Sequence, residues 1–311
     1  MAERLRIGLI GWGTVGAAFG QLVATGPLPV ELARLAVRDP ARERASALPL
    51  GVEIGLPDDI ARGPELAVVV ELAGGADAAL PWARGTLERG AAYVTANKAL
   101  LATHGDELAA LATHHGGALL ASASVGGGTP MIETVEHLAA TGEVTGLRGL
   151  LNATTTYVLS AMADGATYAE ALAQAQQAGY AEADPTFDVE GRDAAQKLAI
   201  LASVAWGRWR GEHEVDTRGI VGAAVPPGRV IRLVAEADGR RMLVEPRELP
   251  ERSELASAAG VESVLEVDVR DAGTFRVRGA GAGGRVTAGA VYADLARLAA
   301  GERPILFGGR S

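Results

Sequence analysis

The glycine-rich turn in "IGLIGWGTVG" constrains the fold of this chain more than any other segment. Its glycines directly follow a short apolar run and precede a segment of helical character. In a strand–turn–helix, glycines at this spacing allow a tight turn, close approach of the backbone to a pyrophosphate, and close helix packing. The alternative interpretation is a purely structural turn. We favour a dinucleotide-binding loop, whose cofactor-binding residues would be Gly11, Gly13, Thr14, Val15 and Gly16.

Short apolar runs alternate with helix-like segments throughout the first third of the chain. Continuous hydrophobicity in such runs is typical of strands that are buried on both faces of a parallel sheet. The pattern predicts the α/β class, with a Rossmann-type doubly wound parallel sheet. The five runs that we interpret as strands are 5–11, 31–37, 66–74, 91–97 and 117–125.

A different pattern begins after about residue 130. The run at 144–152 resembles a strand and is followed by helical segments, and from residue 228 onward apolar and polar residues alternate. Such alternation is typical of a half-exposed antiparallel sheet. We therefore expect a dinucleotide-binding domain at 1–130 and a second, α+β domain at 131–285. The helix at about 286–311 is expected to return to the first domain.

Charge and composition exclude several functions and locations. The net charge of −9, with no block of basic residues, argues against a nucleic-acid partner. The chain has no cysteine, which excludes disulfides, thiolate metal sites and a cysteine nucleophile and fits a reducing cytoplasm. There is no evident signal peptide, and no apolar run reaches the roughly 18 residues of a membrane helix. We expect a cytoplasmic protein with no membrane partner.

Lysine is rare in this sequence, and its two positions are therefore informative. Of 29 basic residues, 27 are arginine and two are lysine, Lys98 and Lys197. An arginine stays charged, whereas a lysine amine can lose its proton when desolvated. Lys98 follows a predicted strand of the first domain, at the edge where open α/β sheets bind ligands. Both positions are candidates for chemistry that arginine cannot perform.

Lys197 lies in a predicted helix that is otherwise apolar around it. Asp193 stands four residues earlier and therefore shares its helix face, and Glu182 and Asp188 lie in the preceding loop. These carboxylates could hold the ammonium end of an amino-acid substrate, and a partly desolvated lysine could donate or accept a proton. The alternative is an ordinary salt-bridged helix start. Asp184, before a proline, is better explained as a turn residue.

The end of the second predicted strand bears on the choice of cofactor. An acidic residue there would bind a ribose 2′-hydroxyl, whereas arginine would accommodate a 2′-phosphate. Here Arg38 comes first, Asp39 follows, and Arg42 and Arg44 are close behind. NADP is favoured and NAD stays possible.

A series of motifs runs over about residues 5–300. They are "GLIGWGTVG", "VVVELAGG", "VTANKALLA", "SVGGGTPMIETV", "LNATTTYVLSAM", "GYAEADPTFDVEGRDAAQKLAILA" and "GAGAGGRVTAGAVYADL". In order and spacing these motifs resemble those of homoserine dehydrogenases, and the segment from Gly179 to Lys197 is the most specific of them. The resemblance implies reversible NAD(P)-dependent reduction of L-aspartate 4-semialdehyde to L-homoserine, by a catalytic and dimerisation domain at 131–285.

The resemblance also implies roles for individual residues. Lys197 would be the acid/base group at the oxygen that is reduced, with Lys98 near the same oxygen. The substrate-binding residues would be Glu182, Asp193, Asp188, Tyr180 and Thr154. The cofactor site would gain Gly74, Lys98 and Gly281, and a sodium ion is possible at Val125 and Gly127.

The chain departs from the family pattern at several positions. Ala121 and Ser122 replace an aromatic residue and a glutamate near the sodium site, and "NATTTY" replaces "NGTTNY" through Ala153 and Thr156. A different amino-acid aldehyde as substrate, or a nucleotide-sensing protein without catalysis, are the alternatives. The family forms homodimers through its central sheet, so a homodimer is expected. The length also predicts the short form without kinase or regulatory domains.

Overall fold

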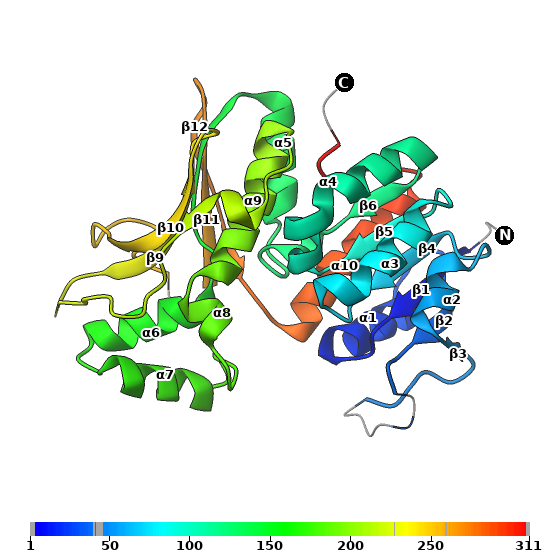
Figure 1. Ribbon diagram of the computed structural model, residues 1–311, viewed down its shortest axis with the longest axis horizontal. Coiled ribbons are helices and arrows are strands. Elements are labelled where there is room, and N and C mark those ends of the chain that lie inside the picture. The colour runs from blue at the N-terminus through cyan, green and yellow to red at the C-terminus, as the bar shows by residue number, and fades with distance from the viewer. Residues whose placement is uncertain are drawn as a thin grey trace. The chain divides into compact units, whose positions relative to one another are not determined.

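A computed structural model describes residues 4–39, 41, 46–226, 228–258, 260 and 262–308 of the 311-residue chain. The chain folds into two compact units, which are described separately (Figure 1). The first unit comprises Met1–Gly128 and Gly283–Ser311, and the second comprises Thr129–Ala282. Of the described helices, none is both long enough and apolar enough to cross a membrane.

The first unit is built on a six-stranded parallel sheet in the order β3-β2-β1-β4-β5-β6. The strand order reverses between β1 and β4, which is where doubly wound folds bind ligands. Every residue of β4 and β5 is buried, so the prediction of strands covered on both faces is confirmed. The strands are β1 (Leu5–Ile10), β2 (Val30–Ala36), β3 (Glu53–Gly55), β4 (Val68–Glu71), β5 (Ala92–Thr95) and β6 (Ala118–Leu120).

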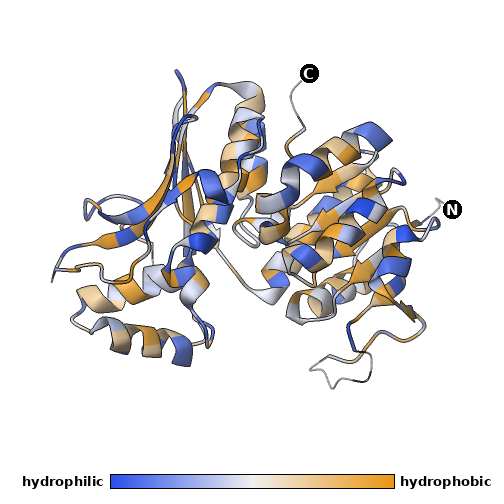
Figure 2. Cartoon of the chain, viewed as in Figure 1, coloured by the Kyte–Doolittle hydropathy of each residue, from blue (hydrophilic) through white to orange (hydrophobic). Residues whose placement is uncertain are grey.

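Helices cover this sheet and form its core with it. Buried side chains from the strands, such as Leu9 and Val70, pack with Phe19 of α1 and Leu295 of α10 in one apolar cluster. The sheet strands are accordingly orange in Figure 2, and the helices around them show both colours. The helices are α1 (Thr14–Thr25), α2 (Pro57–Arg62), α3 (Ala76–Leu87), α4 (Lys98–His115), η1 (Ser122–Ser124) and α10 (Gly284–Ala299).

The strand predicted at 117–125 is shorter than expected. It ends at Leu120, and Ser122–Ser124 form a turn of 3₁₀ helix. Ser122 donates from its backbone N and its Oγ to the carboxylate of buried Asp294, at 3.1 and 2.6 Å. Because this partner is distant in the sequence, local hydrophobicity could not predict where the strand ends.

The second unit contains a mixed six-stranded sheet in the order β12-β11-β7-β9-β10-β8. All of its strand pairs are antiparallel except β10 with β8. The α/β class with a second α+β domain is thus confirmed. The strands are β7 (Val144–Leu150), β8 (Val215–Thr217), β9 (Ile231–Ala237), β10 (Met242–Glu248), β11 (Glu262–Val269) and β12 (Gly273–Ala280). The helices are α5 (Met131–Thr141), α6 (Ala153–Ala163), α7 (Tyr168–Gln177), α8 (Thr186–Val189), α9 (Arg192–Trp206) and η2 (Glu212–Glu214).

One face of the second sheet carries a row of alternating charges. Cross-strand pairing aligns Glu236, Arg148, Glu266 and Arg276 on β9, β7, β11 and β12. Arg148 Nε lies 2.8 Å from Glu236, and Arg276 Nε lies 2.9 Å from Glu266. These side chains are partly exposed, so each pair adds little to stability. The row nevertheless gives this face a defined charge pattern.

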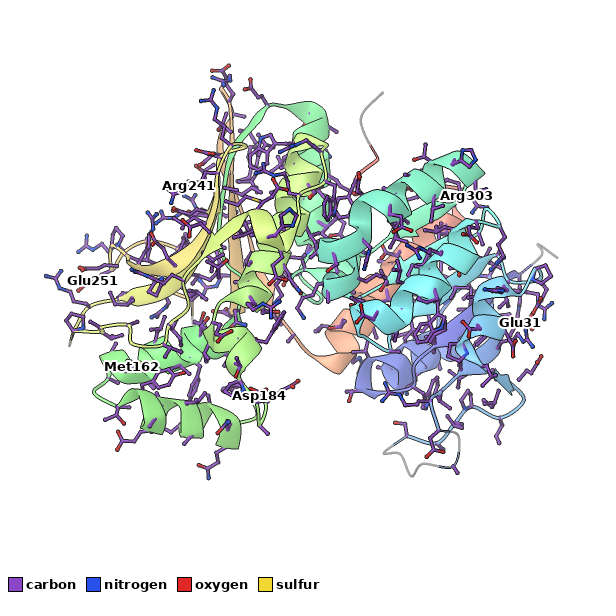
Figure 3. All side chains as sticks on the ribbon, in the orientation of Figure 1. Glu31, Met162, Asp184, Arg241, Glu251 and Arg303 are labelled. Carbon is purple, nitrogen blue, oxygen red and sulfur yellow. The ribbon has the colours of Figure 1, made fainter. Side chains whose placement is uncertain are left out.

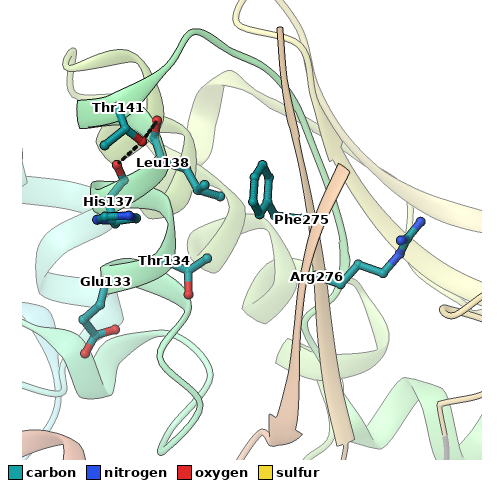
Figure 4. Close-up of a pocket in the computed structure, with 7 residues that line it drawn as sticks. All are labelled: Glu133, Thr134, His137, Leu138, Thr141, Phe275 and Arg276. Carbon is teal, nitrogen blue, oxygen red and sulfur yellow. Dashed lines mark hydrogen bonds between the residues drawn. The ribbon is translucent and has the colours of Figure 1, made fainter. Parts of the chain in front are cut away.

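The edge strand β12 borders a hollow of about 470 Å³ beside α5. Figure 4 shows Phe275 turned toward α5 and its neighbour Arg276 turned to the opposite face, as the strand pleat requires. On α5 the hollow is lined by Glu133, Thr134, His137, Leu138 and Thr141. None of the lining residues belongs to the predicted site.

Candidate active site

The glycine loop lies between β1 and α1, and two of its glycines are required by close backbone contacts. Gly11 has φ +105°, and a Cβ there would lie 2.7 Å from the carbonyl carbon of Leu72. A Cβ on Gly16 would lie 2.2 Å from the carbonyl oxygen of Gly11. A side chain at Gly11 would therefore force the glycine loop away from the turn after β4, and one at Gly16 would distort the glycine loop itself.

Gly13 has a different role, because a Cβ there would meet no atom within 4 Å. Its φ of −89° is open to any residue, so the fold itself does not require glycine here. Gly13 is the N-cap of α1 and provides no side-chain cap for the N–H groups of the first turn, which contains Thr14 and Val15. Uncapped N–H groups, the helix dipole and open space suit a phosphate. The loop residues thus fit the pyrophosphate of a dinucleotide.

Trp12, which the sequence analysis did not identify, lies inside this loop. Its ring lies against Gly20 of α1, where a Cβ would approach the indole to 2.4 Å. Its Nε1 donates a hydrogen bond to the carbonyl oxygen of Ala47, at 3.1 Å. Trp12 therefore connects the glycine loop to the segment that follows β2, where Arg38 lies.

Arg38 and Asp39 are both exposed just beyond the end of β2. The Oδ1 atom of Asp39 accepts a hydrogen bond from the backbone N of Ala41, at 2.9 Å. This aspartate is thus partly engaged in its own turn, whereas the Arg38 side chain is accessible. Arg42 and Arg44 lie outside the described residues.

Lys98 is the first residue of α4, one position after the helix N-cap. The cap is Asn97, whose Oδ1 accepts from the backbone N of Leu100 at 3.2 Å. Asn97 also donates from Nδ2 to the carbonyl oxygen of Gly75, at 3.1 Å. The Lys98 turn and the loop after β4, which contains Gly74, are therefore joined at the carboxyl edge of the sheet.

In the second unit, Lys197 is held by two oxygens in a largely buried position. Its Nζ donates to the carbonyl oxygen of Leu151 at 2.7 Å and to Asp193 Oδ2 at 2.8 Å. The side chains of Lys197 and Asp193 are 15% and 7% exposed, so the pair belongs to the interior rather than to the surface. An ammonium has three N–H groups, so these two hydrogen bonds leave one N–H for a further acceptor.

Asn152 organises the carboxylates around this lysine. Its Nδ2 donates to Asp188 Oδ1 at 2.7 Å and to Asp193 Oδ2 at 2.8 Å. Its Oδ1 caps α6 by accepting from the backbone N of Thr155, at 2.8 Å. Sequence reasoning missed Asn152, although an asparagine directly before a helix is a recognised N-cap signal.

The remaining predicted substrate residues divide into two groups. Thr154 Oγ1 lies 2.6 Å from the carbonyl oxygen of Tyr180 and 3.0 Å from Asp188 Oδ2, so these three residues are adjacent. Glu182 is exposed on the loop between α7 and α8, and no contact of its side chain joins it to the lysine. Asp184, on the same loop in Figure 3, accepts from the backbone N of Thr186 at 3.1 Å, which is a turn.

Family comparisons match both parts of the chain. A homoserine dehydrogenase model matches residues 130–296, and a model for the NAD-binding domain of homoserine dehydrogenase matches residues 11–121. The homoserine dehydrogenase of Synechocystis is 36% identical to this chain, in an alignment that covers 94% of this chain and 73% of the relative. That of Pseudomonas aeruginosa is also 36% identical, with coverages of 94% and 71%.

Solved structures agree with these matches. The homoserine dehydrogenase of Thiobacillus denitrificans aligns with a TM-score of 0.87 at 32% identity, covering 95% of this chain and 73% of that one. A hyperthermophilic archaeal homoserine dehydrogenase in complex with NADPH aligns with a TM-score of 0.86 at 26% identity, covering 97% and 99%.

The chain belongs to the homoserine dehydrogenase family. It is an NAD(P)-dependent oxidoreductase that interconverts L-aspartate 4-semialdehyde and L-homoserine, a step of threonine and methionine biosynthesis.

With the family established, its departures in this chain can be located. Thr156 is buried and donates from Oγ1 to the carbonyl oxygen of Asn152, at 3.0 Å. Ala153 begins α6. Ser122 is hydrogen-bonded to both carboxylate oxygens of Asp294.

The predicted sodium residues Val125 and Gly127 lie a few positions after Ser122. Among the described residues, no cluster of three or more acidic or histidine side chains could hold a metal. The residues beside this position therefore do not supply a metal with an unengaged carboxylate. Gly281 follows directly after β12.

We predict that Asn152 supports activity through its amide and not only as a helix cap. Asn152→Ser retains a capping oxygen but cannot reach both carboxylates, so its kcat/KM for homoserine should fall more than about tenfold. Because the cap is kept, its unfolding free energy should fall less than that of Asn152→Ala. Asn152→Ala should lose activity and also about 1–3 kcal/mol of unfolding free energy. Steady-state kinetics and chemical denaturation measure the two effects.

Thr167→Ala is the matched control, because Thr167 caps the neighbouring helix α7 without touching the lysine. It should lose stability and keep kcat/KM. Wild-type kcat/KM in Asn152→Ser would contradict the assigned role.

Proposed function

We propose that Lys197 is the acid/base group of the reaction. When bound, NAD(P)H supplies the hydride to the aldehyde carbon. Lys197 then provides a proton to the carbonyl oxygen, and in the reverse direction it accepts the hydroxyl proton of homoserine. The observation that carries this proposal is the ammonium group fixed by Leu151 and Asp193, with one N–H left for a ligand.

The carboxylates beside Lys197 suit the ammonium end of an amino-acid substrate. Asp193 and Asp188 lie on either side of Asn152, and Thr154 and Tyr180 are adjacent. We propose that these side chains bind the substrate, and that exposed Glu182 joins them. A negative cluster attracts the α-ammonium group and orients the aldehyde relative to the lysine. For Lys98, we propose a part in the same reaction from its turn at the edge of the first sheet.

The role of Lys197 predicts a difference between lysine and arginine at this position. Lys197→Ala should reduce kcat for homoserine oxidation by about 10²–10⁴-fold. Lys197→Arg keeps the positive charge but should fail equally, because guanidinium does not release a proton near neutral pH. Lys98→Ala should also lose turnover. The measurement is initial rates at alkaline pH with NADP and NAD in parallel.

Cofactor binding serves as the control, and it should survive in Lys197→Ala. Turnover at the wild-type level in Lys197→Arg would rule out proton transfer by this residue. A wild type that binds cofactor without oxidising homoserine would point to another amino-acid aldehyde.

For the cofactor, we propose a preference for NADP over NAD. Arg38 is exposed beyond β2, whereas the neighbouring Asp39 is engaged with Ala41. A guanidinium at this place would bind a 2′-phosphate. An archaeal relative was solved in complex with NADPH, which is consistent with this choice.

Arg38→Ala tests the preference. The Kd for NADPH should rise about 10- to 100-fold through the loss of a charge-assisted hydrogen bond, and the Kd for NADH should change little. Fluorescence titration measures both constants. The matched control is Arg6→Ala, an exposed arginine in β1 on the amino side of the glycine loop. An equal change for both cofactors would exclude 2′-phosphate recognition by Arg38.

We infer that any sodium ion at Val125 and Gly127 would be held by neutral oxygens. Ser122 offers a hydroxyl where the family has a carboxylate, and that hydroxyl donates to Asp294. The proton transfer assigned to Lys197 requires no metal.

For the assembly, we propose a homodimer formed through the sheet of the second unit. The charge row of Glu236, Arg148, Glu266 and Arg276 is self-complementary. If a two-fold axis lies in the interface perpendicular to the row, the row of the second copy runs in the reverse order. Each acid then lies opposite a base of the second copy.

A homodimer would have twice the chain mass of 31.8 kDa in light scattering at moderate salt. Arg276→Glu leaves two acids side by side in each copy and should shift the mass toward that of one chain. The control is Arg297→Glu, at a partly exposed position on α10 in the first unit, where the arginine likewise pairs with a glutamate. A wild type that stays at 31.8 kDa at all concentrations would refute the homodimer.

A further inference from the structure

The proposed reaction does not use a buried carboxylate at the carboxyl end of strand β4. Glu71, the last residue of β4, is 0% exposed. Its Oε1 accepts from the backbone N of Ala73 at 2.7 Å and of Gly74 at 2.8 Å, and its Oε2 accepts from Thr95 Oγ1 at 2.8 Å. Among the described residues no basic side chain is paired with it. A buried carboxylate without a cation depends on such hydrogen bonds, so its partners are held firmly.

The first consequence concerns the turn that follows β4. Gly74 and Gly75 have φ values of +74° and +84°, a left-handed conformation that other residues rarely adopt. A Cβ at either position would meet nothing within 4 Å, so no atom packs against the Cβ side of these two glycines. The carboxylate of Glu71 therefore supplies the main side-chain anchor of this turn.

The same turn is in contact with the glycine loop. A Cβ on Gly11 would lie 2.7–2.8 Å from the atoms of the Leu72–Ala73 peptide. The backbone N of Leu72 donates to the carbonyl oxygen of Ile10, at 2.8 Å. A displacement of the turn after β4 would therefore displace Gly11 as well, because interiors packed this closely transmit shifts.

The other oxygen of Glu71 leads to the Lys98 turn. The Oγ1 atom of Thr95, which donates to Glu71, accepts from the backbone N of Asn97 at 2.9 Å. Asn97 in turn binds the carbonyl oxygen of Gly75 and caps α4, on which Lys98 comes first. The glycine loop, the turn after β4 and the Lys98 turn thus share one anchor.

We propose that Glu71 is a positioning residue that sets the geometry of the cofactor site through these three turns. Its side chain is fully buried and its hydrogen bonds go to the protein, so the role assigned to it is indirect. The inference rests on the proposed cofactor role of the loop from Gly11 to Gly16. Removal of the acceptor oxygens should therefore weaken NADPH binding while the unit remains folded.

The test is the Kd for NADPH, measured by fluorescence titration beside the thermal midpoint of the cofactor-free protein. Glu71→Met keeps a similar volume without acceptors and should weaken binding about 10- to 100-fold, as expected for the loss of one hydrogen bond to a charged phosphate. Glu71→Gln should retain most of the affinity, because its oxygen can accept from both backbone N–H groups and its amide can donate to Thr95.

Tyr93→Phe is the matched control in the same buried region. The Tyr93 hydroxyl has no hydrogen-bond partner among the described residues, and burial together with nearby Glu71 holds the pKa of Tyr93 well above its ordinary value. The variant should bind NADPH like the wild type. If Glu71→Met does not fold, Thr95→Val and Thr95→Ser repeat the comparison, with weak binding expected in the valine variant only.

Gly13→Val separates this inference from the function on which it rests. A Cβ at Gly13 would meet no atom within 4 Å, and the extended backbone there suits valine, so the variant should fold and block the phosphate position. Normal NADPH binding by Gly13→Val would overturn the cofactor role of the loop and this inference with it. Weak binding by Gly13→Val but wild-type binding by Glu71→Met would overturn the role of Glu71 alone. Equal weakening in the glutamine and methionine variants would also overturn it, because charge rather than acceptor geometry would then be responsible.

Discussion

The first unit depends on backbone segments lying closer together than any side chain permits. Gly11 lies against the Leu72–Ala73 peptide, and Gly16 lies against the carbonyl oxygen of Gly11. These contacts occur where the strand order reverses, between β1 and β4. Loops that leave a parallel sheet at such a point determine what can bind above it. Because these contacts are between main-chain atoms, the two loops cannot move independently. A side chain that fixes the backbone of one loop, as Glu71 does at Ala73 and Gly74, therefore also fixes the other.

Both units place a polar side chain in the interior and satisfy it with short hydrogen bonds. Glu71 accepts from two backbone N–H groups and a hydroxyl, and Lys197 donates to a backbone carbonyl and to Asp193. Removing one partner of such a group is costly because the other remains buried and unsatisfied. The two groups nevertheless differ in function. The oxygens of Glu71 face the protein's own loops, whereas the hydrogen bonds of Lys197 leave one of its three N–H groups for a further acceptor.

The fold could largely be predicted from the sequence because its main signals are local. Continuous apolar runs indicated the parallel strands, and alternation after residue 228 indicated the second sheet. Features that depend on distant partners could not be predicted. The 3₁₀ turn at Ser122 requires Asp294, 172 positions away, and β3 is too short and too exposed to show a pattern.

The candidate site shows the same division. Lys197 and Asp193 were identified from their spacing and apolar surroundings, since both features lie within one helix. Asn152, Thr95 and Glu71 escaped notice because polar residues at strand and helix ends are common in any sequence. Their importance lies in which atoms they meet, and those atoms belong to other segments.

Two of the departures from the family pattern introduce hydroxyl groups, and both are hydrogen-bonded inside the protein. Each of the two new hydroxyl groups is buried and has a partner inside its own unit: Thr156 donates to the carbonyl oxygen of Asn152, and Ser122 donates to Asp294. A hydroxyl that is satisfied internally presents little to a ligand. These substitutions therefore change how the scaffold is held together and leave the lysine, its acceptors and its remaining N–H in place. The hydrogen bonds that hold Lys197 are kept because the new hydroxyl groups are directed to other partners in the protein.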